Sequence, residues 1–215
     1  MNAKYLLLVF LVTCVVGCKK STNRIPPVTS PVVTASDTIV DCKYSFDEAI
    51  KGSKAPDSIL AELELIAVHY YSFDGKIHRG QLLLNKKIAG DVAEVFRFIL
   101  ESKFPVAKVI PVVKYKWDDT KSMNDNNSYS FCYRNVSYSK HARGMAVDIN
   151  PQQNPVRWNK EFRAIRTDKP RGAVYDPSKP GTFYPEQPVV LKFKEKGFFW
   201  GRNFSRNDDD HHFEK

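Results

Sequence analysis

Residues 63–102 read LELIAVHYYSFDGKIHRGQLLLNKKIAGDVAEVFRFILES, and this stretch does most to decide the fold. Two runs rich in β-branched, aromatic and aliphatic residues, 63–72 and 77–85, flank Asp74-Gly75, a dipeptide that favours a tight turn. We therefore predict a β-hairpin. In residues 87–102 the apolar side chains recur at helical spacing, which predicts a helix with one buried face. That face carries Ile88, Val92, Val95, Phe96, Ile99 and Leu100.

Further elements are expected before and after this stretch. Ser45, followed by Asp47-Glu48, is typical of a capped short helix that ends near Gly52. Residues 106–115 resemble a strand, in which Pro111 indicates an edge or a bulge.

The second half of the chain is more irregular. Residues 117–133 are polar, and a polar segment of this length in a compact domain predicts a functional loop. A Pro-rich excursion covers 151–188, and a short helix is expected at 189–196 before the strand-like residues 197–200 and the end of the chain at 208–214. Because strands and helices do not alternate regularly, we predict an α+β domain with an antiparallel sheet.

The composition places the chain among globular proteins. It has 215 residues, of which 42% are hydrophobic and 27% charged, and a formal net charge of +9. A basic surface fits an anionic partner such as a cell-wall polymer, nucleic acid or lipid headgroups, and it also fits plain solubility. Aromatic RNA-binding stretches and zinc-finger spacing are absent from the sequence, so we expect no nucleic-acid partner.

The N-terminus predicts export. Residues 5–16 form a nearly unbroken apolar run, which is too short to span a bilayer comfortably but typical of a signal peptide. Val15-Val16-Gly17-Cys18 resembles the bacterial lipobox, which implies a lipoprotein signal at residues 1–18, with Cys18 kept as the lipidation site when the signal is removed. Residues 19–44 are rich in Pro, Ser and Thr and are interpreted as a tether to a domain at 45–215. We expect a lipid-anchored protein of the cell envelope that faces the periplasm or the cell exterior.

Two cysteines remain in the domain and its tether, Cys42 and Cys132. An even number in an oxidising compartment is compatible with a disulfide. Two buried thiols are the alternative.

The sharpest chemical signal is the segment from Ser139 to Asp148, which contains His141 and, seven residues later, a carboxylate. A tight turn at Gly144 would direct both side chains to one point, because Gly permits the required φ and a close backbone approach. The run Asp208-Asp209-Asp210-His211-His212 supplies more His and carboxylate groups far downstream. Three N and O ligands with one open position are typical of catalytic zinc.

These residues resemble the zinc D-alanyl-D-alanine carboxypeptidase family, which includes vancomycin-resistance-type dipeptidases and L-alanyl-D-glutamate endopeptidases. The resemblance covers roughly residues 45–215. Its motifs are Ser139-x-His141-x-x-Gly144-x-Ala146-x-Asp148, Asp209-x-x-His212, Phe73-Asp74-Gly75-Lys76-x-His78-x-Gly80, Asp119-x-x-Ser122-Met123, Asn126-Asn127-Ser128, Ile149-Asn150-Pro151-x-x-Asn154-Pro155 and Gly197-Phe198-x-Trp200-Gly201. It implies a single domain with a central antiparallel sheet flanked by helices, of the hedgehog and D-Ala-D-Ala-peptidase type.

The resemblance also implies roles for individual residues. His141, Asp148 and His212 would be the zinc ligands, and Asp209 the general base and acid. Arg134 would hold the terminal carboxylate of the substrate, because its fork of donors suits a planar anion.

Ser139 would help to orient the substrate or a ligand, although it could equally be a simple turn hydroxyl. His211 beside His212, and Asp210 beside Asp209, leave the register of the last motif open. An extended segment would turn His211 to the opposite side from His212.

The implied activity is hydrolysis of peptidoglycan stem peptides by a monomeric zinc metallopeptidase, with D-alanyl-D-alanine carboxypeptidase action expected first. The alternatives are an L-Ala-D-Glu endopeptidase of the same family and a non-catalytic zinc protein that binds the cell wall. Serine chemistry at Ser137-x-x-Lys140 lacks the Lys-Thr-Gly motif of serine peptidases. Cysteine chemistry at Cys132 with His141 lacks a third, orienting group.

Overall fold

The computed structural model describes residues 38–215. The expected signal peptide with Cys18, and most of the expected tether, lie outside the described residues. No helix in the described part of the chain is long and apolar enough to cross a membrane. The elements run β1 (Ile39–Val40), α1 (Phe46–Ile50), α2 (Asp57–Leu60), β2 (Leu63–Tyr71), β3 (Ile77–Asn85), α3 (Lys86–Glu101), η2 (Val112–Tyr115), α4 (Asp119–Asn124), η3 (His141–Arg143), β4 (Ala146–Asp148), β5 (Val156–Trp158), α5 (Pro188–Glu195), β6 (Phe199–Trp200), η4 (Gly201–Asn203), β7 (Asn207–Asp209) and β8 (His212–Glu214).

The predicted hairpin is confirmed. Strands β2 and β3 pair antiparallel over their whole lengths, from Leu63 opposite Asn85 to Tyr71 opposite Ile77. Gly75 has a φ of 76°, which the turn between the strands requires and which glycine adopts without strain. On its other edge, β3 is joined by the short parallel strand β1.

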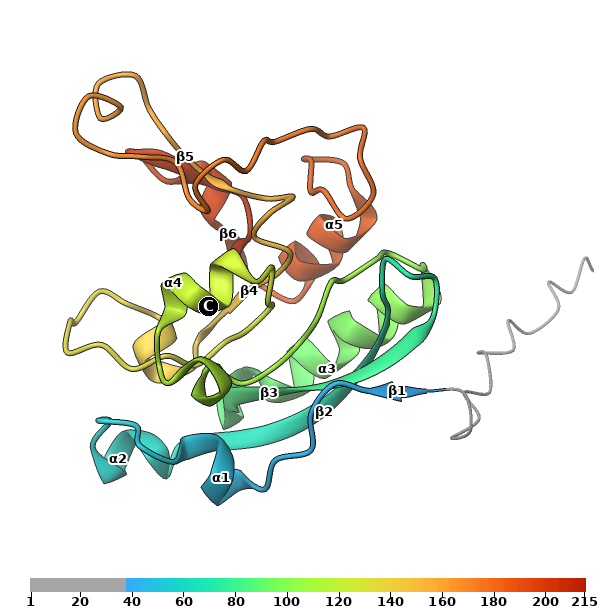
Figure 1. Ribbon diagram of the computed structural model, residues 1–215, viewed down its shortest axis with the longest axis vertical. Coiled ribbons are helices and arrows are strands. Elements are labelled where there is room, and N and C mark those ends of the chain that lie inside the picture. The colour runs from blue at the N-terminus through green and yellow to red at the C-terminus, as the bar shows by residue number, and fades with distance from the viewer. Residues whose placement is uncertain (1–37) are drawn as a thin grey trace, which may run out of the picture. The chain divides into compact units, whose positions relative to one another are not determined.

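The second half of β3 is buried on both faces, and Leu82, Leu83 and Leu84 there form a continuous apolar run rather than an alternating pattern. Leu82 and Leu84 face the main core, which α3 and α5 help to form, whereas Leu83 faces a second cluster with Phe131 and Leu63. Figure 1 shows α3 lying along the hairpin and α1 and α2 at its opposite side. Burial of each such aliphatic side chain contributes about 1.5–3 kcal/mol to folding.

The predicted helices are also present. Ser45 and Glu48 form a reciprocal capping box at α1, as the sequence pattern indicated. Helix α3 begins after Asn85, whose side chain accepts a hydrogen bond from the backbone N–H of Lys87. Helix α5 begins at Pro188, which tolerates the first helical turn because its missing N–H has no partner there.

The second half of the chain adds two small sheets that carry most of the site. One has the order β4-β8-β6, and the other is the pair β5-β7. The α+β class is therefore confirmed. The expected single central sheet is not, because the strands of the described residues divide among three small sheets.

Residues 106–115 do not form the predicted strand. Only Val109 makes a bridge, with Ser128, and the segment then turns into η2 after Pro111. The backbone groups of Ile110 bond to the Asn127 side chain instead of to a neighbouring strand. The expected loop at 117–133 likewise contains α4, which Asp118 caps by accepting a hydrogen bond from the Lys121 N–H.

Both cysteines of the described region are free thiols. Cys42 lies near the carbonyl of Val109, and Cys132 lies near the carbonyl of Trp117. Of the two alternatives that the sequence left open, the structure has the separate thiols.

Candidate metal centre and its cavity

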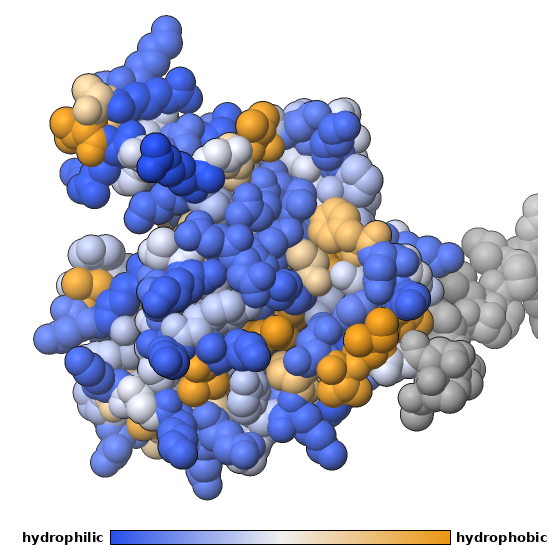
Figure 2. Space-filling model, viewed as in Figure 1, coloured by the Kyte–Doolittle hydropathy of each residue, from blue (hydrophilic) through white to orange (hydrophobic). Residues whose placement is uncertain are grey.

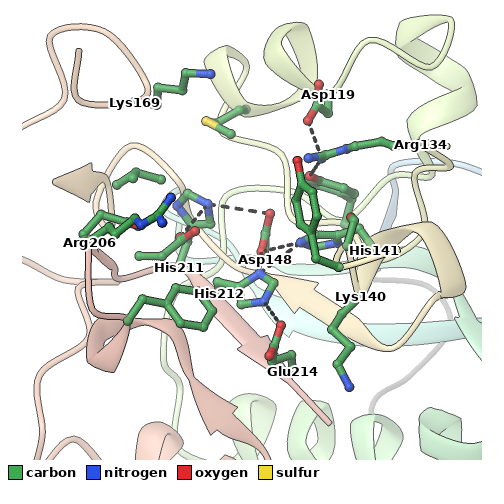
Figure 3. Close-up of a pocket in the computed structure, with 18 of the residues that line it drawn as sticks. Asp119, Arg134, Lys140, His141, Asp148, Lys169, Arg206, His211, His212 and Glu214 are labelled. Atoms are coloured by element: carbon green, nitrogen blue, oxygen red, sulfur yellow. Dashed lines mark hydrogen bonds and ion pairs between the residues drawn. The ribbon is translucent and has the colours of Figure 1, made fainter. Parts of the chain in front are cut away.

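Three buried side chains from distant parts of the sequence meet at one point (Figure 3). His141 Nε2 lies 3.0 Å from His212 Nδ1 and 3.1 Å from Asp148 Oδ1, and His212 Nδ1 lies 3.0 Å from the same Asp148 oxygen. The three atoms thus form a nearly equilateral triangle. These are the three residues that the sequence resemblance implied as zinc ligands.

Strand register explains how two of the three come together. In the antiparallel pair β4-β8, Asp148 stands directly opposite His212. Directly opposite residues project to the same face with their Cβ atoms about 4.5–5.5 Å apart. The β4-β8 pairing therefore brings together two groups that are 64 residues apart.

A tight turn brings in the third. His141 begins η3, and Gly144 ends it with a φ of 66°. A Cβ on Gly144 would lie 2.7 Å from the backbone nitrogen of Asn85, so only glycine fits between this turn and the hairpin. The ring of His141 stacks on Tyr129, with the centroids 4.9 Å apart.

Each imidazole has a partner on its other nitrogen. His141 Nδ1 contacts the backbone carbonyl of Ser130, and His212 Nε2 lies 3.0 Å from Glu214 Oε2. A carbonyl or carboxylate in this place holds the proton on that nitrogen and leaves the opposite nitrogen free to bind a metal. Both free nitrogens belong to the triangle.

The carboxyl of Asp148 is buried among imidazole rings. Burial raises the pKa of the Asp148 carboxyl, but the neighbouring His141 and His211 imidazoles outweigh it, so this pKa lies well below its ordinary value. Burial lowers the pKa of His212, whereas hydrogen bonds to Asp148 and Glu214 raise it, to about 10 overall. The carboxylate is therefore ionised at neutral pH.

The donor set fits zinc. Zinc takes His nitrogen and carboxylate oxygen at about 2.0–2.2 Å, which in a tetrahedron separates the ligand atoms by roughly 3.3 Å. The observed separations of 3.0–3.1 Å are close to this value. Three protein ligands beside an open cavity are typical of a catalytic rather than a structural zinc site.

The cavity beside the triangle has a volume of about 550 Å³. Arg134, Ser139 and Asp209, the other site residues expected from the sequence, all line it. Arg134 is ion-paired with Asp119 at the first turn of α4, and its guanidinium lies 3.4 Å from the Tyr129 hydroxyl. The substrate-binding candidates therefore share one cavity with the metal-binding candidates.

Asp209 and Asp210, between which the sequence left the register open, differ sharply in their surroundings. Asp209 faces the cavity, and its Oδ1 is buried without a hydrogen-bond partner among the described residues. Asp210 is fully buried and ion-paired with Arg157 and Arg202, at 2.8 and 2.9 Å. Of these two carboxylates, Asp209 lines the cavity and Asp210 does not.

His211 does not face away, contrary to the prediction from an extended segment. It lies in the turn between β7 and β8, and its Nε2 is 3.1 Å from Asp209 Oδ1, although not in hydrogen-bonding geometry. The same nitrogen is 3.6 Å from Asp148 Oδ2, and Nδ1 lies 2.7 Å from the Asn154 carbonyl. His211 thus lies beside the triangle without supplying one of its three atoms.

Sequence reasoning missed Glu214 and misplaced His211. Glu214 could have been found, because the residue two positions after His212 on a strand projects to the same face. The position of His211 could not have been found in this way, because it depends on a turn that the sequence pattern does not predict.

The two alternative nucleophiles find no support in this arrangement. Cys132 is 2% exposed, and burial raises the pKa of its thiol to about 11, which makes the reactive thiolate scarce at neutral pH. Ser137 is not among the residues that line the cavity.

Comparison with known proteins agrees with the resemblance. No curated protein and no solved structure matches the chain. A family model does match, over residues 134–215, a segment that contains the whole triangle and Asp209. The family that this part of the chain matches is a peptidase family, the D-alanyl-D-alanine carboxypeptidases.

Proposed function

We propose that the protein is a zinc-dependent peptidase that removes the terminal D-alanine from peptidoglycan stem peptides. The observation that carries this proposal is the triangle of His141 Nε2, Asp148 Oδ1 and His212 Nδ1, set beside Asp209 in a cavity. The family match over the same residues supports a peptidase.

In this proposal His141, Asp148 and His212 hold the zinc ion. A zinc ion held in this way lowers the pKa of water and polarises the scissile carbonyl. Ser130 and Glu214 orient the two imidazoles from behind.

Asp209 acts as the general base and then as the general acid. Its buried oxygen without a hydrogen-bond partner accepts the proton of the attacking water. The same carboxyl returns the proton to the nitrogen of the leaving amino acid. The burial of Asp210 among Arg157 and Arg202 leaves this role to Asp209 alone.

Arg134 binds the terminal carboxylate of the substrate, with Ser139 nearby on the cavity wall. The guanidinium already contacts Asp119, which uses part of its donor fork and fixes its direction. Its remaining N–H groups are available for a planar anion.

The net charge and the N-terminal sequence support a substrate and a location at the cell wall. A net charge of +9 favours an anionic polymer, and a lipid on Cys18 would hold a monomeric domain near the wall from the periplasmic or outer side of a membrane. The substrate and the location are both part of the proposal.

The test uses the purified protein and a defined stem pentapeptide that ends in D-Ala-D-Ala, with mass spectrometry of the products. We expect zinc-dependent loss of one D-Ala, abolished by a chelator and restored by added zinc. Cleavage between L-Ala and D-Glu instead would contradict the carboxypeptidase activity and support the alternative, an endopeptidase of the same family. A zinc-loaded protein that binds peptidoglycan and cleaves neither bond would contradict the enzyme and support the wall-binding alternative.

A further inference from the structure

The cavity carries positive charge that the proposed reaction does not use. Lys169 and Arg206 both line it, on the side of the triangle opposite to Arg134 (Figure 3). Within residues 38–215 neither side chain makes a hydrogen bond or an ion pair. Two unpaired cations at the wall of one cavity attract an anion and lower the free energy of its bound state.

Three other basic side chains near the first cavity already have partners. Arg157 pairs with Asp208 and Asp210, and Arg202 with Asp210. Lys140, also on the cavity wall, donates to the backbone carbonyl of Lys215. Lys169 and Arg206 are therefore distinguished from their neighbours by both position and lack of a partner.

Backbone hydrogen bonds connect Lys169 to the β5-β7 sheet, which carries Asp209. The N–H and carbonyl of Lys169 both bond to Val156 on β5, at 3.0 and 2.7 Å. Val156 in turn stands opposite Asp209 in the β5-β7 pair. The Pro-rich excursion thus returns to the β5-β7 sheet at Lys169, and Arg206 immediately precedes β7. Both basic residues are therefore attached to the two strands that position Asp209.

The cavity also continues past Lys169. A second cavity of about 360 Å³ shares Met123 and Lys169 with the first, and lies between α4 and residues 167–171. Arg171 lines it, as does Asp168, whose Oδ1 accepts the Trp158 N–H. Figure 2 shows a notch between the lobe formed by the excursion and the body of the domain. Together the two cavities offer room for several residues of an extended peptide, rather than for a free dipeptide.

We propose that Lys169 and Arg206 bind a second carboxylate of the substrate, distinct from the C-terminal one assigned to Arg134. The substrate class is then an extended acidic peptide that occupies both cavities. This inference rests on the proposed function, because it takes the triangle as the place of cleavage.

The test compares two peptides that differ in one charge. One is an N-acetylated stem pentapeptide with L-Lys at its third position and a free D-Glu α-carboxylate, and the other has that carboxylate amidated. The wild type should cleave the acidic peptide with a kcat/KM about two- to fivefold above that of the amide, as expected for an ion pair with exposed side chains. Lys169→Ala and Arg206→Ala should each reduce this preference, and the double variant should abolish it, with cleavage of the amide unchanged within about twofold.

Lys179→Ala is the matched control, because Lys179 is exposed on the same excursion but lines neither cavity. It should keep the wild-type preference. Equal cleavage of both peptides by the wild type, or a preference that survives in the double variant, would overturn the inference.

Binding separates this inference from the proposed function. Calorimetry on the zinc-loaded Asp209→Asn variant, which is expected to keep the metal and lose turnover, measures the affinity for both peptides without cleavage. A charge preference in affinity that depends on Lys169 would support the subsite even in a protein that cleaves neither peptide. Cleavage of both peptides without such a preference would leave the proposed function intact and reject the subsite.

Discussion

Asp209 and Asp210 are chemically identical neighbours with opposite surroundings, and for this reason the proposed function assigns the proton chemistry to Asp209. The partners of Asp210 are two guanidinium groups, so its carboxylate is held as a structural anion. Asp209 instead lines the cavity, and its buried Oδ1 has no hydrogen-bond partner among the described residues. Such an unsatisfied group costs about 1–3 kcal/mol in stability and persists where it has a function.

Asp209→Asn should keep the zinc and lose the activity. The amide has nearly the same shape but cannot accept a proton, and loss of a general base lowers kcat by about 10²–10⁴-fold. Zinc content by elemental analysis and kcat on the stem pentapeptide are the two readouts. Wild-type turnover in this variant would reject the role of Asp209.

Glu214→Gln should weaken zinc binding without removing a ligand. The carboxylate of Glu214 holds the proton on His212 Nε2, and loss of such an outer partner typically lowers metal affinity about 10–100-fold. Competition with a chromogenic chelator measures the affinity. Glu186→Gln, an exposed carboxylate without partners among the described residues, is the control and should match the wild type. An unchanged affinity in Glu214→Gln would show that this contact does not orient His212.

At the scale of elements, the site depends on one turn and one strand register. The register of β4 and β8 brings Asp148 and His212 together, and the turn that ends at Gly144 adds His141. A shift of one residue in the register would move His212 to the opposite face of its strand. The pairing of Trp200 on β6 with Phe213 on β8 opposes such a shift, because Phe213 is fully buried in the main core.

Gly144→Ala should destabilise the fold and weaken the metal site together. The added methyl would clash with the backbone of Asn85, and the φ of 66° is strained for alanine. We expect a loss of more than about 1 kcal/mol in the free energy of unfolding, measured by denaturant titration.

Gly90→Ala is the matched control for this variant. It adds the same methyl group inside α3, where nothing lies within 4 Å of the new Cβ, and should stabilise the protein by about 0.5–1 kcal/mol. Equal effects of the two substitutions would show that the turn at Gly144 is not strained by a side chain.

Elements with strong local signals could be predicted from the sequence, and those that depend on tertiary contacts could not. The Asp74-Gly75 hairpin, the Ser45 cap and the apolar face of α3 are local patterns, and all three are present. Residues 106–115 are apolar enough for a strand, but Asn127 takes the hydrogen bonds of Ile110 from seventeen residues away. Local sequence patterns do not reveal a side-chain contact over that separation.

The same contrast holds for the site. The triangle could be proposed because its spacing resembles a known family, whereas the inward direction of His211 arises from the turn between β7 and β8 and from the Asn154 carbonyl. The ion pair between Asp210 and Arg157 likewise could not be predicted from the sequence, since the two residues lie 53 positions apart.

At the scale of the whole molecule, the site joins segments that are far apart in the chain. His141 and His212 are 71 residues apart, and the hairpin and α3 contribute no ligand but support the turn and the sheet that do. A metal ion held here crosslinks the middle of the domain to its C-terminus. Zinc that binds only the folded protein should therefore raise its stability, by about 2.7 kcal/mol when free zinc is 100-fold above the Kd.

Zinc titration of the purified, metal-free protein tests the central claim most directly. We expect one zinc ion per chain, a rise in Tm on binding, and loss of both in His141→Ala, Asp148→Ala and His212→Ala, whereas His69→Ala on β2 should behave as the wild type. Undiminished zinc binding in the three ligand variants would contradict the account.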